Sequence, residues 1–408
     1  MFHFGASTSA HQVEGGNHND WSEWELKTAK LKVLAAKNKK WPEFIANSYP
    51  SPYEEKNYIS GNASGHYNRY EKDFDIAKSL GHNAHRFSIE WSRIEPEEGR
   101  FNEKEIEHYR RVIGALRARG MEPFVTLWHW TLPVWFAKKG GWLNHKSSFY
   151  FSRYAEKIVS ALGDDVNFWL TLNEPDVNPS FGYLLGKWPP QRRSLIVYLR
   201  VTRNLAAAHN SAYKVIKGKF PNSKIGIAKH NAYFEAGDKN PVNRLLKFAT
   251  DWWWNEYFLN RISKHQDFIG LNHYFHNRIN WGFNKNKNER ISDMGWEVHP
   301  EGIYHVLKDL AQYKKPIYIT ENGVADARDA CREAFIRETL EWVKKAIGEG
   351  TDVRGYFHWS LLDNFEWADG FWPRFGLIAV DYKTLERKIR PSAFAYKKMI
   401  EEWGGNKA

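Results

Sequence analysis

The sequence predicts a single α/β domain, residues 1–408, built as a (β/α)8 barrel with extended loops after its strands. Three observations lead to this prediction. The chain contains eight short runs of β-type residues, most intervals between them carry helical patterning, and no Gly-rich phosphate loop follows any run. An open doubly wound sheet is the competing fold, but eight alternations without a phosphate loop favour the closed barrel.

The predicted elements follow one another along the whole chain. The strands are 2–7, 83–91, 122–130, 166–174, 224–234, 267–274, 316–321 and 353–362. The helices between them are 70–80, 103–119, 149–162, 201–219, 302–313 and 330–348. A last helix at 392–403 is expected to close the ring.

Two segments fall outside this alternation. Residues 27–65, rich in Lys, Asn, Pro and Tyr, are interpreted as an extended insertion after the first strand that forms part of one wall of the barrel mouth. Residues 404–408 are expected to be a disordered tail. Neither an internal repeat nor a low-complexity linker divides the chain.

Composition indicates an ordinary globular protein, with 42% hydrophobic and 26% charged residues. There is no run of about 18 apolar residues, so we expect no membrane partner. The first residues lack the basic and apolar regions of a signal peptide, and the single cysteine, Cys331, has no internal partner. A cytoplasmic location is therefore predicted.

The net charge of +11 and the 20 tryptophans stand out. Lys and Arg are spread along the chain, with modest clusters only at 37–40 and 285–290, so we expect no nucleic-acid partner. Flat indole faces match the apolar faces of sugar rings, which favours a carbohydrate site. Most of the tryptophans are nevertheless expected to fill the core.

Two carboxylates directly follow apolar β runs. Glu174 ends the fourth run in residues 171–175 (TLNEP), and Glu321 ends the seventh in residues 317–323 (IYITENG). Because barrel active sites lie at the carboxyl ends of the strands, both side chains can point into one mouth. Glycosidases need such a pair, and a gap of about 5 Å between the carboxyls gives retention. Either glutamate alone could cap a helix, but two together, each beside an asparagine, favour catalysis.

Other strand ends also carry polar or aromatic residues that could reach the mouth. These are Gln12 and Glu14 after the first strand, Arg86 and Glu90 in the second, and His129 in the third. The later ones are Asn173, Asn231, Asn272, Tyr274, Asn322 and Trp359.

The glutamate motifs resemble the two signature motifs of the family 1 glycoside hydrolases, which are retaining β-glycosidases of the β-glucosidase and β-galactosidase type. The resemblance covers nearly the whole chain. It extends to residues 9–15 (SAHQVEG), 86–93 (RFSIEWSR), 127–130 (LWHW) with 132–133 (LP), 267–274 (DFIGLNHY), 359–367 (WSLLDNFEW) and 374–377 (RFGL).

The resemblance implies a role for the residues around each glutamate. Glu174 matches the acid/base and Glu321 the nucleophile, while Asn173 matches the residue that holds the sugar 2-hydroxyl. Arg86 and Tyr274 match groups that contact the nucleophile and keep it ionised.

The resemblance also implies a subsite for the terminal sugar. Gln12, His129, Glu366 and Trp367 match readers of its hydroxyls, and Trp359 matches the platform under its ring. Family members that act on 6-phosphorylated sugars lack the carboxylate of Glu366, and a carboxylate repels phosphate. We therefore expect neutral glycosides, gluco- or galacto-configured first and fucosides third.

The implied activity is exo-acting hydrolysis of terminal non-reducing β-D-glucosyl residues, or galactosyl and fucosyl residues, by double displacement. Small-molecule β-glycosides or oligosaccharides would be the partners, with no metal and no organic cofactor, since no metal-binding helix motif is present. The oligomeric state stays open. Two alternatives also remain: a transglycosylase using the same site, and a non-catalytic carbohydrate-binding protein, against which the two glutamates argue.

One connection departs from the family pattern. Residues 235–266, between the fifth and sixth strands, look shorter than usual, so a wall on the leaving-group side is expected to be missing. The run 251–254 (DWWW) lies in this connection. It could supply a replacement aromatic surface, although packing against the barrel is the favoured interpretation.

Overall fold

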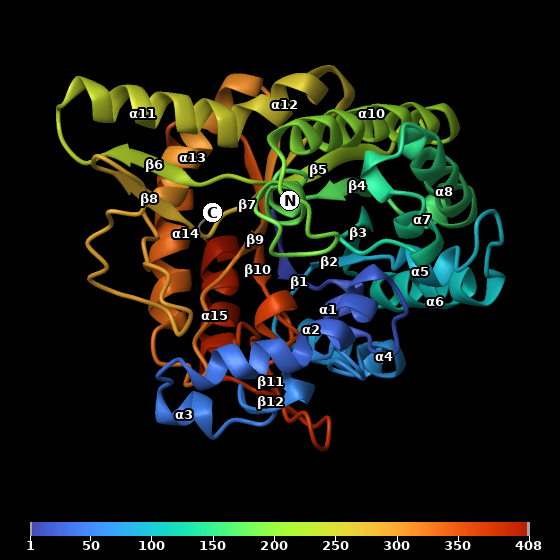
Figure 1. Cartoon of the computed structure of the whole chain (residues 1–408), viewed down its shortest axis with the longest axis horizontal. Coiled ribbons are helices and arrows are strands. Elements are labelled where there is room, and N and C mark those ends of the chain that lie inside the picture. The colour runs from blue at the N-terminus through green and yellow to red at the C-terminus, as the bar shows by residue number, and fades with distance from the viewer. Residues whose placement is uncertain (1, 406–408) are drawn as a thin grey trace.

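The computed structural model describes residues 2–405, and its centre is a closed barrel of eight parallel strands (Figure 1). The strands are β1 (His3–Ser7), β2 (Ala84–Ser88), β3 (Glu122–Trp128), β4 (Phe168–Asn173), β5 (Lys224–His230), β7 (Ile269–Asn272), β9 (Ile317–Asn322) and β10 (Val353–Trp359). β1 pairs with both β2 and β10, which closes the ring. All eight predicted strands are confirmed, and the open-sheet alternative is wrong.

The barrel interior is apolar toward the amino ends of the strands. Phe124 of β3 stacks on Phe168 of β4 with ring centroids 4.2 Å apart and meets Phe357 of β10 at 4.8 Å. Because side chains two residues apart share one face of a strand, Thr126 follows Phe124 on the inside. The same alternation places Arg86 two residues beyond the buried Ala84. Apolar filling thus gives way to polar side chains toward the carboxyl ends.

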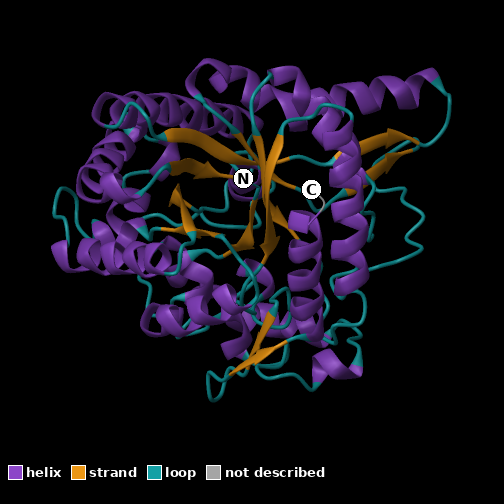
Figure 2. Ribbon diagram, turned by 180° about the vertical axis from the view of Figure 1, so that it is seen from behind, coloured by secondary structure: helices purple, strands orange, loops and turns teal. Residues whose placement is uncertain are grey.

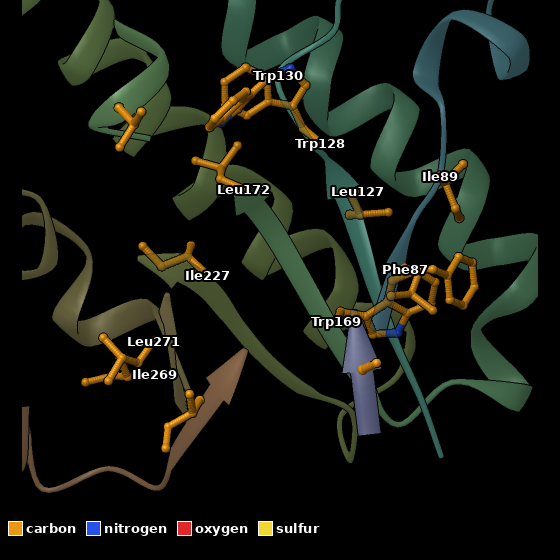
Figure 3. Close-up of a cluster of buried hydrophobic side chains, with 14 of the residues drawn as sticks. Phe87, Ile89, Leu127, Trp128, Trp130, Trp169, Leu172, Ile227, Ile269 and Leu271 are labelled. Atoms are coloured by element: carbon orange, nitrogen blue, oxygen red, sulfur yellow. The ribbon is translucent and has the colours of Figure 1, made fainter. Parts of the chain in front are cut away.

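A second apolar layer lies between the strands and the surrounding helices. Figure 3 shows part of it, including Phe87, Leu127, Trp169 and Leu271. Trp169 is completely buried there. These residues alternate with the interior ones along their strands, so the strands are buried on both faces, as is usual for parallel strands.

The helices form a ring outside the strands (Figure 2). The seven predicted helices are all present: α4 (His66–Ser79), α6 (Glu103–Ala118), α8 (Ser147–Leu162), α10 (Leu195–Lys219), α13 (Gly302–Leu310), α14 (Arg332–Gly348) and α15 (Pro391–Gly405). Shorter helices are α1 (Ala10–Val13), α3 (Glu43–Ala46), α5 (Trp91–Ile94), α7 (Val134–Lys138), α9 (Val177–Pro179) and α12 (Tyr257–Ile262).

The segment after β1 is more regular than the sequence predicted. Helix α2 (Asp20–Lys37) enters the predicted insertion 27–65, so the first part of that insertion is helical. A capping box starts this helix, because Asn19 accepts a hydrogen bond from the backbone N–H of Ser22, and the Ser22 hydroxyl oxygen accepts one from the backbone N–H of Asn19. The rest of the segment contains α3 and a short 3-10 turn.

The connection between β5 and β7 forms a small unit of its own. Strands β6 (Tyr233–Ala236) and β8 (His276–Ile279) pair in parallel just beyond the carboxyl ends of β5 and β7. Helix α11 (Pro241–Asp251) lies along them in Figure 1. Of the aromatic run, the Trp254 indole N–H donates to His230 Nδ1 at 3.0 Å, while Trp252 is 43% exposed. Packing therefore accounts for part of this run only.

The carboxyl-terminal part adds a two-stranded antiparallel ribbon, β11 (Ile378–Val380) and β12 (Arg387–Ile389). Helix α15 continues to Gly405 and so includes the first two residues of the predicted tail 404–408. The remainder of that predicted tail, 406–408, lies outside the described residues. Within residues 2–405, no helix combines the length and the apolar character needed to cross a bilayer.

Candidate active site

Glu174 and Glu321 both lie at the carboxyl end of the barrel and are both buried, 5% and 4% exposed. Glu321 belongs to β9 and Glu174 directly follows β4. Asn272 of β7 lies between them: its side-chain N–H donates to Glu174 Oε1 at 2.8 Å. The structure therefore brings together the two carboxyls that the sequence singled out.

Arg86 holds Glu321 in place from the other side of the barrel. Its guanidinium, 1% exposed, forms an ion pair with Glu321 Oε1. It also donates to Asn173 Oδ1 at 2.7 Å and to Thr126 Oγ1 at 3.1 Å. The Tyr274 hydroxyl donates to Glu321 Oε2 at 2.8 Å. Both predicted contacts of Glu321 are present.

The two carboxyls differ in their electrostatic surroundings. Burial and the charge of Glu321 raise the pKa of Glu174 well above its ordinary value. Burial also raises the pKa of Glu321, but the charge of Arg86 and the hydrogen bond from Tyr274 oppose that rise. Among residues 2–405, only Glu321 of this pair has a cation in contact, so the proton shared by the pair resides on Glu174.

Asn173 connects this pair to His129. The Asn173 side-chain N–H lies 3.0 Å from His129 Nε2, which must then accept. Burial and the charge of Arg86 lower the pKa of His129 well below its ordinary value, so the ring is neutral. Its proton therefore sits on Nδ1, for which the described residues offer no acceptor. Nδ1 can donate to a hydroxyl group.

Gln12 and Glu366 lie together at another part of the mouth. The Gln12 side-chain N–H₂ contacts Asn364 Oδ1 at 3.0 Å, the Phe365 carbonyl at 2.9 Å and Glu366 Oε2 at 3.3 Å. Burial and the charges of Asp369 and Glu321 raise the pKa of Glu366 to about 8. At neutral pH this carboxyl can both donate and accept a hydrogen bond.

Trp359 and Trp367 supply aromatic surface around His129. The His129 ring lies 6.3 Å from Trp359 and 5.9 Å from Trp367, nearly parallel to both. Both indoles are almost fully buried, 4% and 3% exposed. All ten predicted site residues thus lie at the carboxyl end of the barrel.

Backbone strain is concentrated at the same end. Glu174, Trp130 and Trp367 have φ angles of +43°, +78° and +49°, in the left-handed region that L-residues with bulky side chains avoid. Such conformations persist only where the surrounding structure imposes them, and they cluster at functional sites.

Sequence reasoning missed the importance of Asn272. Besides Glu174, its side-chain N–H₂ contacts Asn173 Oδ1 at 3.2 Å, and its Oδ1 accepts from the Thr320 hydroxyl at 2.7 Å. Its position at the end of the sixth strand was the only signal. Two other strand-end carboxylates have structural partners instead: Glu14 pairs with Arg93 and Tyr109, and Glu90 bonds to Ser92 and Thr131.

No group of three His, Cys, Asp or Glu side chains within residues 2–405 is arranged to hold a metal ion. The chemistry that the site offers is that of a carboxyl pair with unequal proton affinities, lined by hydrogen-bonding groups and indoles.

Comparison of the sequence with known families agrees with the chemistry of this site. The sequence profile described as "Glycosyl hydrolase family 1" matches residues 1–263 and 233–405. The chain belongs to glycosyl hydrolase family 1. The resemblance predicted from the glutamate motifs is therefore confirmed.

Relatives of this family 1 glycosyl hydrolase are similar over nearly its whole length. Beta-glucosidase A of Thermotoga maritima is 35% identical, covering 99% of this chain and 97% of its own. A beta-galactosidase of Pyrococcus woesei is 31% identical, covering 82% of this chain and 86% of its own. The solved beta-glycosidase of Pyrococcus horikoshii superimposes with a TM-score of 0.87 at 39% identity, covering 98% and 93%. The protein is thus a glycoside hydrolase of the β-glucosidase type, and the alternative of a non-catalytic binding protein is set aside.

We predict that Glu366→Gln changes how stability depends on pH. The pKa of Glu366 is about 8 in the folded protein and near 4.5 in the unfolded chain. The contribution of Glu366 to the free energy of unfolding is therefore fully present below pH 4.5 and is lost as the pH rises through 8. Glutamine does not titrate. The variant should therefore gain free energy of unfolding relative to wild type, by up to about 1.4 kcal/mol per pH unit between these values. Denaturant unfolding of both proteins at pH 5.5 and 8.5 measures the difference in free energy of unfolding between variant and wild type. A difference that is the same at both pH values contradicts the prediction.

Proposed function

We propose that this family 1 glycosyl hydrolase removes terminal non-reducing β-D-glucosyl residues with retention, by double displacement. The observation that carries the proposal is the asymmetry of the carboxyl pair. Of the two carboxyls, Glu321 is the one that Arg86 and Tyr274 contact, so Glu321 is the ionised partner and Glu174 the protonated one. One acid and one nucleophile are what the retaining reaction needs.

In the first step, Glu174 protonates the glycosidic oxygen while Glu321 attacks the anomeric carbon. The bond from that carbon to the leaving group breaks, the leaving group departs with the proton of Glu174, and a glycosyl ester forms on Glu321. Asn173, whose Oδ1 accepts hydrogen bonds from Arg86 and Asn272, would bind the sugar 2-hydroxyl. That bond strengthens in the transition state.

In the second step, water attacks the anomeric carbon of the ester and Glu174, now ionised, takes its proton. The bond to Glu321 breaks, and the Glu321 carboxylate is restored beside Arg86. Each displacement inverts the anomeric carbon, so the two together retain its configuration.

The terminal sugar would lie against Trp359, with its hydroxyls read by Gln12, His129, Glu366 and Trp367. The Nδ1–H of His129 supports this assignment because it is a donor without a protein acceptor in the part of the chain that the structure describes. Gln12 Oε1 likewise has no protein partner there. Buried groups of this kind discriminate strongly in favour of substrates that pair with them.

Neutral sugars are the proposed substrates. A protonated Glu366 carries no charge to repel phosphate, so the argument for neutral sugars rests on its surroundings instead. Asp369 and Glu321 are the charges that raise its pKa, and both are acidic. Galactosides are proposed beside glucosides, with fucosides third, and the name of the Pyrococcus woesei relative supports the galactosides.

We predict that Glu321→Gly abolishes hydrolysis and that added azide restores turnover with the opposite anomeric outcome. Azide can occupy the space of the lost carboxylate and attack once, whereas the natural reaction attacks twice. The rate without azide should fall by at least about 10³-fold, the order seen when a unit of catalytic machinery is removed. Proton NMR of the glycosyl azide reports its anomeric configuration. A retained product would contradict the role of Glu321 as nucleophile.

We predict that Glu174→Ala affects substrates according to their leaving groups. kcat/KM should fall about 10²–10⁴-fold for poor leaving groups, which need protonation, and much less for dinitrophenolate. Comparing methyl and 2,4-dinitrophenyl β-glucosides measures the difference. An equal loss on both substrates would argue against the acid role of Glu174.

A further inference from the structure

A buried ion pair lies next to Glu174 and has no part in the reaction described above. Lys229 of β5 is completely buried, and its Nζ lies 2.6 Å from Asp176 Oδ2. The ammonium also donates to the carbonyl oxygens of His230 and Trp254 at 2.5 and 2.7 Å. All three of its protons are thus used.

Such a pair is expensive to bury. Removing a lysine and an aspartate from water costs several kcal/mol for each ion, and an apolar pair of similar volume is often as stable. Burial lowers the pKa of Lys229, opposed by the charge of Asp176. Stability alone therefore gives no reason for these two residue types at this place.

The position of the pair supplies a reason. Asp176 follows Glu174 by two residues, and the backbone N–H of Glu174 donates to the carbonyl of Ala228 at 2.7 Å. Ala228 and Lys229 are consecutive in β5, so they hold both ends of the segment 174–176. Glu174 has a φ of +43°, and a strained conformation needs surroundings that impose it.

We infer that Lys229 and Asp176 are positioning residues for Glu174. Their ion pair fixes the segment 174–176 against β5, and this keeps the Glu174 carboxyl at Asn272, facing Glu321. The hydrogen bond from Lys229 to the Trp254 carbonyl oxygen also ties this segment to the β5–β7 connection. This inference rests on the proposed acid/base role of Glu174.

The test compares Lys229→Met with wild type on methyl and 2,4-dinitrophenyl β-glucosides. Displacement of Glu174 should lower kcat/KM for the methyl glucoside at least 10-fold more than for the dinitrophenyl glucoside. Asp176→Asn, which leaves the lysine in place, should show the same pattern if Lys229→Met does not fold. The matched control is Asp73→Asn. It breaks another buried ion pair, which joins Asp73 of α4 to Arg387 of β12. It should lower the melting temperature without changing the ratio between the substrates.

An equal loss on both glucosides in Lys229→Met and Asp176→Asn would show a purely structural role and overturn the inference. Glu174→Ala is measured in the same series. If it shows the leaving-group effect and the other two variants do not, the positioning role fails while the proposed function stands. If Glu174→Ala lacks the effect, the proposed function itself fails.

A second, independent observation concerns helix α11, which exposes a row of large apolar side chains although Leu246 packs inward against Phe234 and Ile279. Asn243 is buried, whereas Leu245 is 67% and Phe248 is 68% exposed. Val242 and Trp252, 44% and 43% exposed, extend the same outward face. A surface helix usually places such large apolar side chains on its buried face. Figure 1 shows α11 at the edge of the molecule, beside β6 and β8.

Two more exposed aromatics lie beside this helix. Trp281 and Phe283, 68% and 53% exposed, follow β8, and the Trp281 backbone N–H donates to Asn243 Oδ1 at 2.8 Å. Together they form what we call the α11 surface. Its members are Val242, Leu245, Phe248, Trp252, Trp281 and Phe283.

Exposed cations lie close in sequence to members of the α11 surface. Lys239 and Arg244 flank the amino end of the helix, and Lys285 and Lys287 follow Phe283. The exposed acids nearby are Asp238 and Glu289. A second copy of the chain would bring the same cations face to face, and each chain carries a net charge of +11.

We propose that the α11 surface docks on an anionic lipid bilayer. A helix with an apolar face, aromatic residues and flanking Lys and Arg lies in the plane of the interface without spanning it. Basic residues near such a surface are attracted to anionic headgroups. The composition predicted no membrane partner because the chain has no apolar run long enough to span a bilayer, but a helix that lies in the interface needs no such run.

The test is co-sedimentation with vesicles of equimolar phosphatidylglycerol and phosphatidylcholine at low salt. Wild type should sediment with them, and far less with pure phosphatidylcholine or at high salt. Leu245→Glu combined with Phe248→Glu should reduce the bound fraction at least 10-fold. The matched control is Leu31→Glu with Leu34→Glu on helix α2, which are also exposed and should bind as wild type. Hydrolysis of a soluble nitrophenyl glucoside verifies that each variant is folded.

Three results would overturn this proposal. Wild type could stay in solution with anionic vesicles, or the α2 control could lose binding as much as the α11 variant. Alternatively, light scattering could show a wild-type dimer that the α11 variant converts to monomer, in which case a second copy occupies the surface.

Discussion

The ion pair between Arg86 and Glu321 is the interaction on which the rest of the site depends. A guanidinium buried to 1% exposure needs acceptors around it, and it finds them on three other strands, in Glu321, Asn173 and Thr126. This requirement keeps Glu321 ionised. Because two carboxyls in one buried site cannot both be charged, the proton goes to Glu174, which touches no cation. The proposed division of roles within the pair therefore depends on Arg86 of β2.

Such a polar cluster can be buried only because the other end of the barrel is rigidly apolar. Phe124, Phe168 and Phe357 fill that end with ring contacts, so the polar network above it rests on a buried apolar layer. Interactions between charges are stronger in such surroundings than in water. The apolar filling therefore contributes to the electrostatics of the site as well as to stability.

The barrel and the two glutamates could be predicted from the sequence because each depends on a local pattern. The run 166–174 contains Val166, Phe168, Trp169, Leu170 and Leu172, which favour a buried strand, and a residue that ends a barrel strand must lie at the mouth. Helix α2 was missed for the opposite reason: Leu26, Leu31 and Leu34 are exposed, so its pattern does not follow a buried face. Its capping box at Asn19 was the local signal available.

The side-chain network could not be predicted, because it depends on irregularities that no periodicity reveals. The pairing register shifts between Leu170 and Asn173 where β4 meets β5, and between Leu271 and Asn272 where β7 meets β9. A bulge of this kind redirects the side chains that follow it. Strict alternation would keep Leu170, Leu172 and Glu174 on one face, whereas the shifts allow Asn173 and Asn272 to meet each other and Glu174. The positive φ of Glu174 is a further departure from regular strand geometry. The carboxyl pair therefore lies where the strands become irregular, and periodicity in the sequence cannot predict its contacts.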